Sequence, residues 1–152
     1  MTYKQRQTLI GKLLRQNKGL RYTKGEQLEK CWFEEINGEQ MQVFCNGALV
    51  IALNEENKVD VPTHTEGLGI VKRFFDAMDD YTLNKMDFDL KELKQNKEER
   101  FDIGNGRYNT KYFISCAEAL GKDTVFYQNE NNLRPSYFKG SAGIGLIMPC
   151  RK

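Results

Sequence analysis

An Asn-Gly step between two apolar segments is the feature that most constrains the fold of this chain. Asn37 and Gly38 separate segment 27–36 (QLEKCWFEEI) from segment 41–46 (MQVFCN), and a third apolar segment, 48–54 (ALVIALN), follows shortly after. Asn-Gly favours the tight turn whose twist matches that of antiparallel strands. The first part of the chain is therefore predicted to contain an antiparallel sheet.

Three other segments have the spacing of amphipathic helices. In residues 3–17 the apolar side chains fall on one side of a helix, although Arg6 falls among them. A second helix is predicted at about 69–80. A third is predicted at 109–120, where Asn109 can cap the first turn.

The end of the chain returns to strands, which are predicted at 124–128, 133–140 and 144–152. The order of elements is thus nearly duplicated, as a helix followed by strands occurs twice. Segment 82–100 is strongly charged, and its short apolar set suits either a strand or a helix. A length of 152 residues fits one domain, so we expect a single α+β domain over 1–152.

The cysteines favour a reduced protein without a zinc site. Cys31, Cys45 and Cys116 lie in apolar segments, no CxxC pair is present, and His64 is the one histidine. No segment approaches the roughly 18 apolar residues that a membrane span requires, and no secretory h-region is seen. We therefore expect a cytoplasmic protein without a metal or cofactor.

Charge is unevenly distributed along the sequence. Residues 1–25 contain seven basic and no acidic side chains, whereas residues 26–101 contain 17 acidic and 9 basic ones. Positive side chains attract the phosphates of nucleic acid whatever the base sequence. The residues predicted to contact a duplex DNA backbone, from the polar side of the first helix, are Lys4, Lys12, Arg15 and Lys18, with Arg21 and Lys24 extending the patch. The alternative is a solvated polar face.

The last third of the chain carries a specific series of residues. They are Asn109, Tyr112, Ala119 and Leu120 in the predicted helix, the segment RPSYFKG, and Met148, Pro149, Cys150 and Arg151 at the end. This series resembles the terminal half-domain of bacterial processivity clamps, the β subunits of replicative DNA polymerases. Small phage and prophage proteins end in a similar way.

The resemblance implies a DNA-clamp-like domain, with helices packed on one face of an antiparallel sheet. It also implies a role in DNA association or as a replication accessory protein of phage or prophage origin. Complete clamp rings use six such domains, so a single copy would encircle DNA only by forming a homo-oligomer or by joining another clamp.

In that family the terminal M-P-x-R segment lines a hydrophobic groove for linear peptides of polymerases and repair factors. The resemblance therefore gives Met148, Pro149, Cys150 and Arg151 a peptide-binding role. The alternative is that these residues finish an edge strand, where proline is tolerated.

No group of residues in the sequence has the pattern of a catalytic site. His64 stands alone in a predicted loop, and the segment from Gly140 to Gly145 lacks the Lys-Ser/Thr of a phosphate loop. We therefore predict a non-catalytic binding protein. One alternative is a phage-type interaction protein that binds or inhibits a host protein, with the acidic segment 26–101 as its surface. A metal-dependent enzyme that uses neighbouring carboxylates is a more remote one.

Overall fold

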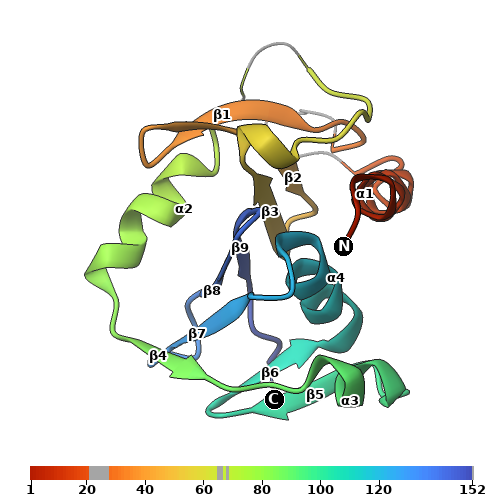
Figure 1. Ribbon diagram of the computed structural model, residues 1–152. Helices are drawn as coiled ribbons and strands as arrows, with labels where there is room; N and C mark the ends of the chain where they lie inside the picture. Colours follow the sequence, from red (N-terminus) through yellow and green to blue (C-terminus); the bar gives the residue numbers. More distant parts are fainter. Residues whose placement is uncertain (21–27, 65–66, 68, 152) are drawn as a thin grey trace.

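Seven strands form one antiparallel sheet in the order β1-β2-β3-β9-β8-β7-β4, and β5 and β6 form a separate hairpin (Figure 1). The strands are β1 (Trp32–Ile36), β2 (Glu39–Cys45), β3 (Leu49–Leu53), β4 (Leu83–Met86), β5 (Arg100–Ile103), β6 (Gly106–Asn109), β7 (Val125–Asn129), β8 (Ser136–Gly140) and β9 (Gly143–Ile147). This computed structural model describes residues 1–20, 28–64, 67 and 69–151. The predicted contacts Arg21 and Lys24 and residue 27 of the predicted strand 27–36 lie outside the described residues. Residues 28–31 are described and precede β1, so this strand begins at Trp32, later than predicted.

The helices are short apart from the first and the last. They are α1 (Tyr3–Gln16), η1 (Glu55–Asn57), α2 (Lys72–Asp76), η2 (Ala77–Asp80), α3 (Leu90–Gln95) and α4 (Thr110–Leu120). The ends of α1 and α4 agree with the sequence prediction. At α1 the Thr2 side chain accepts from Gln5 N, and the Gln5 side chain accepts from Thr2 N, which is a complete capping box.

The Asn-Gly hairpin is confirmed. Asn37 has φ 54° and Gly38 has φ 78°, and these two residues connect β1 to β2 with Ile36 opposite Glu39. Positive φ at both central positions belongs to the turn type that matches the twist of the flanking strands. The turn therefore fixes the register of the first hairpin.

Strand β3 lies in the interior of the sheet, between β2 and β9, and is buried on both faces. Leu49, Ile51 and Leu53 belong to the core cluster that also contains the apolar residues of α1 and α4. Val50 and Ala52 belong to a second cluster, which contains the buried residues of α2. Because successive side chains of a strand point to opposite faces, these two clusters lie on opposite sides of the sheet.

Helices α1 and α4 pack beside each other on one face, as the helical periodicity and the clamp resemblance predict (Figure 1). Helix α4 lies against β3, β8 and β9, and a side chain at Gly145 of β9 would collide with Cys116 Sγ of the helix. Arg6 of α1 is buried and donates from Nε to Ala119 O at 2.8 Å and from Nη1 to Asn57 Oδ1 at 3.3 Å. The position of Arg6 among the apolar residues of the helix is therefore explained by a buried, hydrogen-bonded side chain.

Helix α2 corrects the expectation that all helices share one face, because it packs on the opposite side of the sheet. Its start is set by Glu34 of β1, a buried carboxylate that accepts from Trp32 Nε1, Val71 N and Lys72 N. A carboxylate at a helix N-terminus is stabilising. This tertiary contact explains why the helix begins at Lys72, later than the predicted 69.

The charged segment 82–100 contains three short elements, β4, α3 and the start of β5. Its apolar residues Phe88 and Leu90 pack against the α1–α4 cluster, so the segment closes the core at the end opposite β1 (Figure 1). The predicted strand 144–152 is shorter than expected. It ends at Ile147, and β9 lies between β3 and β8, so the idea that Met148–Arg151 finish an edge strand is wrong.

The two ends of the sheet repeat one arrangement. Helix α1 precedes the meander β1-β2-β3, and α4 precedes the meander β7-β8-β9. The last strands of the two meanders pair with each other, with Ile51 opposite Gly145 at the middle of their register. The near-duplication of elements in the sequence is therefore also present in space.

The four cysteines are free thiols, and three of them are buried. Burial raises the pKa of Cys31 to about 12 and the pKa of Cys116 well above its usual value, because thiolates are poorly solvated in the core. No helix in the described part of the chain is long and apolar enough to cross a membrane.

Candidate nucleic-acid interface

The four predicted DNA contacts are all exposed on the outer side of α1 and just beyond its end. Lys4, Lys12, Arg15 and Lys18 lie opposite the buried residues Ile10, Leu13 and Leu14. Lys4, Lys12 and Arg15 share one sector of the helix surface, because residues three and eleven apart return to nearly the same side, and Lys18 follows the end of the helix. The sequence placed these side chains correctly on the solvent side.

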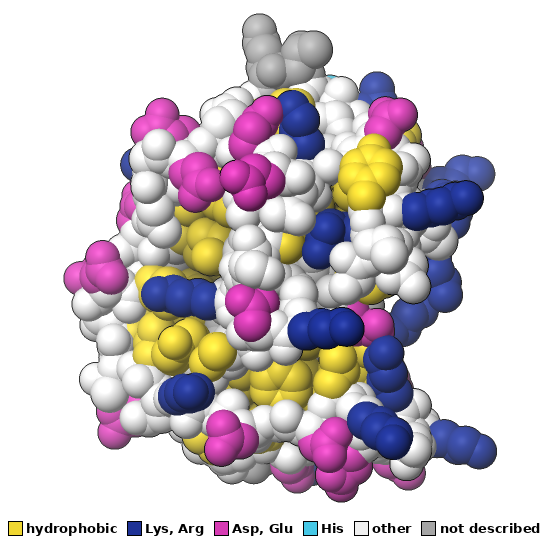
Figure 2. Space-filling model, in the orientation of Figure 1, with side chains coloured by type: hydrophobic (Ala, Val, Ile, Leu, Met, Phe, Trp, Pro, Cys, Tyr) yellow, Lys and Arg dark blue, Asp and Glu magenta, His cyan; other side chains and the backbone are white. Residues whose placement is uncertain are grey.

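Within α1 no carboxylate opposes this basic sector, although Glu98 and Glu99 line the groove beside it and Glu29 accepts from Gly19 N. Residues 1–20 contain no Asp or Glu, and Lys111 of α4 adds another exposed ammonium. Glu118 is the one acidic residue of α4, and its Oε2 lies 2.9 Å from Lys94 Nζ of α3. Figure 2 shows Lys and Arg side chains along the right-hand edge of the molecule, over α1 in its upper part and over the region of α3, β5 and β6 below. Basic side chains therefore outnumber acidic ones on α1 and α4 themselves.

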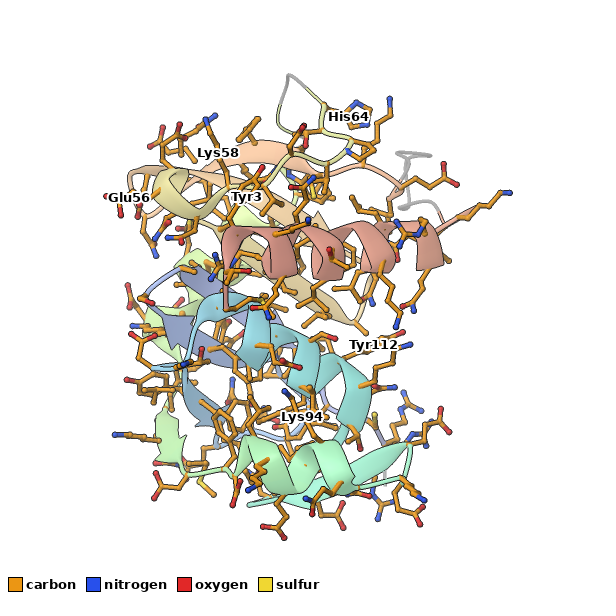
Figure 3. All side chains as sticks on the ribbon, turned by 45° about the vertical axis from the view of Figure 1, so that its right-hand side comes forward. Tyr3, Glu56, Lys58, His64, Lys94 and Tyr112 are labelled. Atoms are coloured by element: carbon orange, nitrogen blue, oxygen red, sulfur yellow. The ribbon has the colours of Figure 1, made fainter. Side chains whose placement is uncertain are left out.

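A groove of about 600 Å³ runs between α1 and α4. Leu9 and Leu13 of α1 and Ile114 of α4 contribute its apolar part, and Lys12 and Lys111 lie on its two sides. In Figure 3 α1 crosses the view above α4. Tyr112 lies in the first turn of α4, and the groove lies beside this N-terminal end of the helix. Residues 96–99 close that end of the groove and add Lys97.

The start of α4 forms one wall of this groove. Asn109 Oδ1 accepts from Tyr112 N at 2.9 Å, so the predicted cap is confirmed, and Thr110 N donates to Glu99 O at 2.9 Å. Thr110 is only 4% exposed, and its hydroxyl oxygen has no hydrogen-bond partner among the described residues. A buried polar group without a partner is uncommon and destabilising.

Sequence reasoning missed Lys97, Thr110 and Lys111 as parts of this surface. Lys97 belongs to the segment whose structure was left open between strand and helix. Lys111 and Thr110 follow the capping residue, but the helical pattern alone does not show that this turn faces α1. Two separately predicted helices had to be placed side by side before the groove could be seen.

The predicted peptide-binding residues follow β9. Met148, Pro149 and Cys150 are half-buried and Arg151 is exposed. Met148 N donates to Ala48 O at 2.9 Å, and Cys150 N donates to Arg107 O of β6 at 2.7 Å. The segment therefore runs between the large sheet and the β5–β6 hairpin, and its peptide-binding role stays a prediction.

The residues considered for catalysis remain separate in space. Within the described ranges, no group of three or more His, Cys, Asp or Glu side chains is placed to hold a metal ion. Gly140 to Gly145 form the turn between β8 and β9 together with the adjoining strand residues. Figure 3 shows His64 on the loop at the top of the molecule, far from the α1–α4 groove.

Comparison with known proteins adds no relative. No protein-family model, curated protein or solved structure matches this chain. The surface formed by α1 and α4 and the residues that resemble the clamp series are therefore the features that bear on function.

Proposed function

We propose that this protein is a non-catalytic, clamp-like DNA-associated domain, a replication accessory protein of phage or prophage origin. The observation that carries the proposal is the α1–α4 surface. Two neighbouring helices present Lys4, Lys12, Arg15, Lys18 and Lys111 on one side of the sheet, and the one carboxylate of the two helices, Glu118, is paired with Lys94. This surface would contact the phosphates of duplex DNA.

The dimensions of α1 suit such contacts. A helix of 14 residues is about 21 Å long, since each residue adds about 1.5 Å. Duplex DNA carries about one negative charge per 1.7 Å of its axis, so side chains between Lys4 and Lys18 could reach several phosphates at once. Contacts of this kind release counterions and carry no sequence information.

The clamp part of the proposal has two supports. One is the residue series of 101–152, and the other is the repeated helix-and-meander arrangement around the β3–β9 pair. One copy would touch duplex DNA from one side. Enclosing DNA would need further copies, and the edge strand β4 offers backbone groups to which a second copy could pair.

The proposal is tested by titrating fluorescent duplex DNA with the wild type and with the variant Lys12→Glu/Arg15→Glu at low salt. We expect weak wild-type binding that does not depend on base sequence, and loss of binding in the variant. Both side chains are exposed, so the variant should fold normally by circular dichroism.

A matched control reverses two charges elsewhere. Lys85 and Lys139 are exposed on β4 and β8, on the face of the sheet opposite α4, so Lys85→Glu/Lys139→Glu changes net charge equally. Binding retained by this control would assign the contact to α1. If the wild type gives no signal, or both variants lose binding equally, the proposed DNA surface is wrong and a protein partner becomes the better alternative.

A further inference from the structure

An apolar groove lies between α3 and β5, at the end of the molecule away from β1 (Figure 1). Its volume is about 660 Å³, and its apolar lining comes from Phe88, Leu93, Phe101 and Ile103. The rings of Phe88 and Phe101 stand edge-on to Phe113 of the core, with centroids 5.2 and 5.0 Å away. The groove is therefore a formed apolar surface that the core holds in place.

The rim of this groove is acidic. Asp89, Glu92 and Asp102 line it, and none of the described residues in its lining is basic. Asp102 is paired with Arg107, whose Nε lies 2.8 Å from Asp102 Oδ1, so Asp89 and Glu92 supply most of the remaining negative charge. Both of these residues are exposed. The partner that complements the groove is therefore an apolar side chain next to a basic one.

The loop between β7 and β8 carries such a pair. Leu133 is 76% exposed, the largest value among the large apolar side chains of the described residues, and Arg134 beside it is also exposed. A single exposed leucine is common on protein surfaces, so the conformation of the loop matters. Asn131 Oδ1 accepts from Leu133 N at 2.9 Å, and Asn131 O accepts from Arg134 N at 3.1 Å. These bonds order the backbone before any contact forms, which lowers the entropy cost of binding through Leu133.

The loop and the groove lie at the same end of the molecule. Asn132 Nδ2 donates to Asn105 O at 3.4 Å, and Asn105 Nδ2 donates to Glu130 O at 2.8 Å, so the loop is tied to the turn of the β5–β6 hairpin. Strand β5 of this hairpin forms one wall of the groove. Two copies that meet at this end can therefore exchange loop and groove across a two-fold axis, the commonest symmetry of soluble oligomers.

We propose that the partner of the α3–β5 groove is a second copy of this chain, with Leu133 of each copy seated in the groove of the other and Arg134 beside Glu92 on its rim. Glu130 belongs to the same loop and has the opposite charge. It lies at the base of the loop, where its N–H donates to Thr82 O at 3.0 Å. The inference goes beyond the proposed function and does not depend on whether the protein binds DNA.

The first test removes the leucine anchor. A contact built on one side chain from each copy is small, so association should be weak and should need high protein concentration. In sedimentation equilibrium, Leu133→Ser should weaken self-association by roughly tenfold or more, as expected for a central apolar anchor. Leu20→Ser is the matched control, because Leu20 is 43% exposed elsewhere on the surface and should leave association unchanged. Wild-type protein that stays monomeric at about millimolar concentration, or equal losses in the two variants, would overturn the proposal.

A charge exchange tests the contact between Arg134 and the rim of the groove. Arg134→Glu and Glu92→Arg should each weaken association by roughly threefold to tenfold, because each variant brings like charges together. The double variant Arg134→Glu/Glu92→Arg has the net charge of the wild type. It should regain most of the lost affinity, since the pair is restored with its signs reversed. A double variant as weak as the product of the two single effects would contradict the contact.

A mixing experiment identifies the two surfaces. Leu133→Ser lacks the anchor but keeps the groove, whereas Glu92→Arg keeps the anchor. Unlabelled Glu92→Arg added to isotope-labelled Leu133→Ser should shift the amide signals of Leu93 and Phe101, and unlabelled Leu133→Ser should not. Shifts confined to β4 would show association through the edge strand and overturn the proposal. Groove signals that respond to a basic leucine-containing peptide but not to wild-type protein would assign the groove to another protein, which also overturns it.

Discussion

Helices α1 and α4 occupy corresponding places in the two halves of the molecule, but they differ in how they are buried. Seven of the 11 residues of α4 are buried against three strands, whereas four of the 14 residues of α1 are buried, mainly at its contact with α4 and the sheet edge. The buried helix has little freedom to change without loss of the fold. The peripheral helix leaves most of its side chains for contacts outside the molecule.

The largest loss of stability is expected from a change on the buried face of α4. Phe113 is fully buried and its ring centroid lies 4.8–5.2 Å from those of Phe88, Phe101, Phe126 and Phe138. Phe113→Ala would leave a cavity at the centre of these rings and should lower the free energy of unfolding by about 3–5 kcal/mol. Denaturant unfolding followed by circular dichroism measures this value. A loss below about 1 kcal/mol would show that α4 is not the scaffold of the domain.

A smaller effect is expected where α1 meets α4. Burial lowers the pKa of Arg6 by desolvation, and the side chain still bonds to the last turn of α4 through Ala119 O. Arg6→Met keeps an apolar stem but removes these hydrogen bonds, so the free energy of unfolding should fall by about 1–3 kcal/mol.

The control for this change is Arg15→Met on the exposed side of the same helix. It should alter the free energy of unfolding by no more than about 0.5 kcal/mol, as is usual for surface substitutions. Equal losses for the two variants would mean that α1 is attached by general packing, with no special part for Arg6. The comparison between a buried and an exposed arginine would then fail.

The sequence predicted those elements whose signals are local. The Asn37-Gly38 turn, the apolar stripe of α1 and the Asn109 cap each involve neighbours within a few residues, and each was placed correctly. The start of α2 could not be predicted, since it depends on Glu34 from a distant strand. Likewise, the burial of Arg6 depends on Ala119, which lies 113 residues away in the sequence.

The candidate site also has one part that local sequence signals predict and another part that depends on contacts between distant residues. The exposure of Lys12 and Arg15 follows from helical periodicity, so half of the surface could be predicted from the sequence. The groove and the unpaired hydroxyl of Thr110 exist only because α4 lies beside α1, and Lys97 joins them from a segment whose fold was ambiguous. Contacts between elements of unknown relative position have no signal in a single sequence.

The salt dependence of duplex binding tests the central claim most directly, because it counts the phosphates that the protein neutralises. A plot of log K against log salt concentration should have a slope of roughly −0.9 per phosphate, so about −3.6 if Lys4, Lys12, Arg15 and Lys18 each neutralise one. Lys12→Gln/Arg15→Gln should reduce the slope by about 1.8. A wild-type slope near zero, or the same slope in the variant, would contradict the assignment of α1 as the DNA-contacting helix.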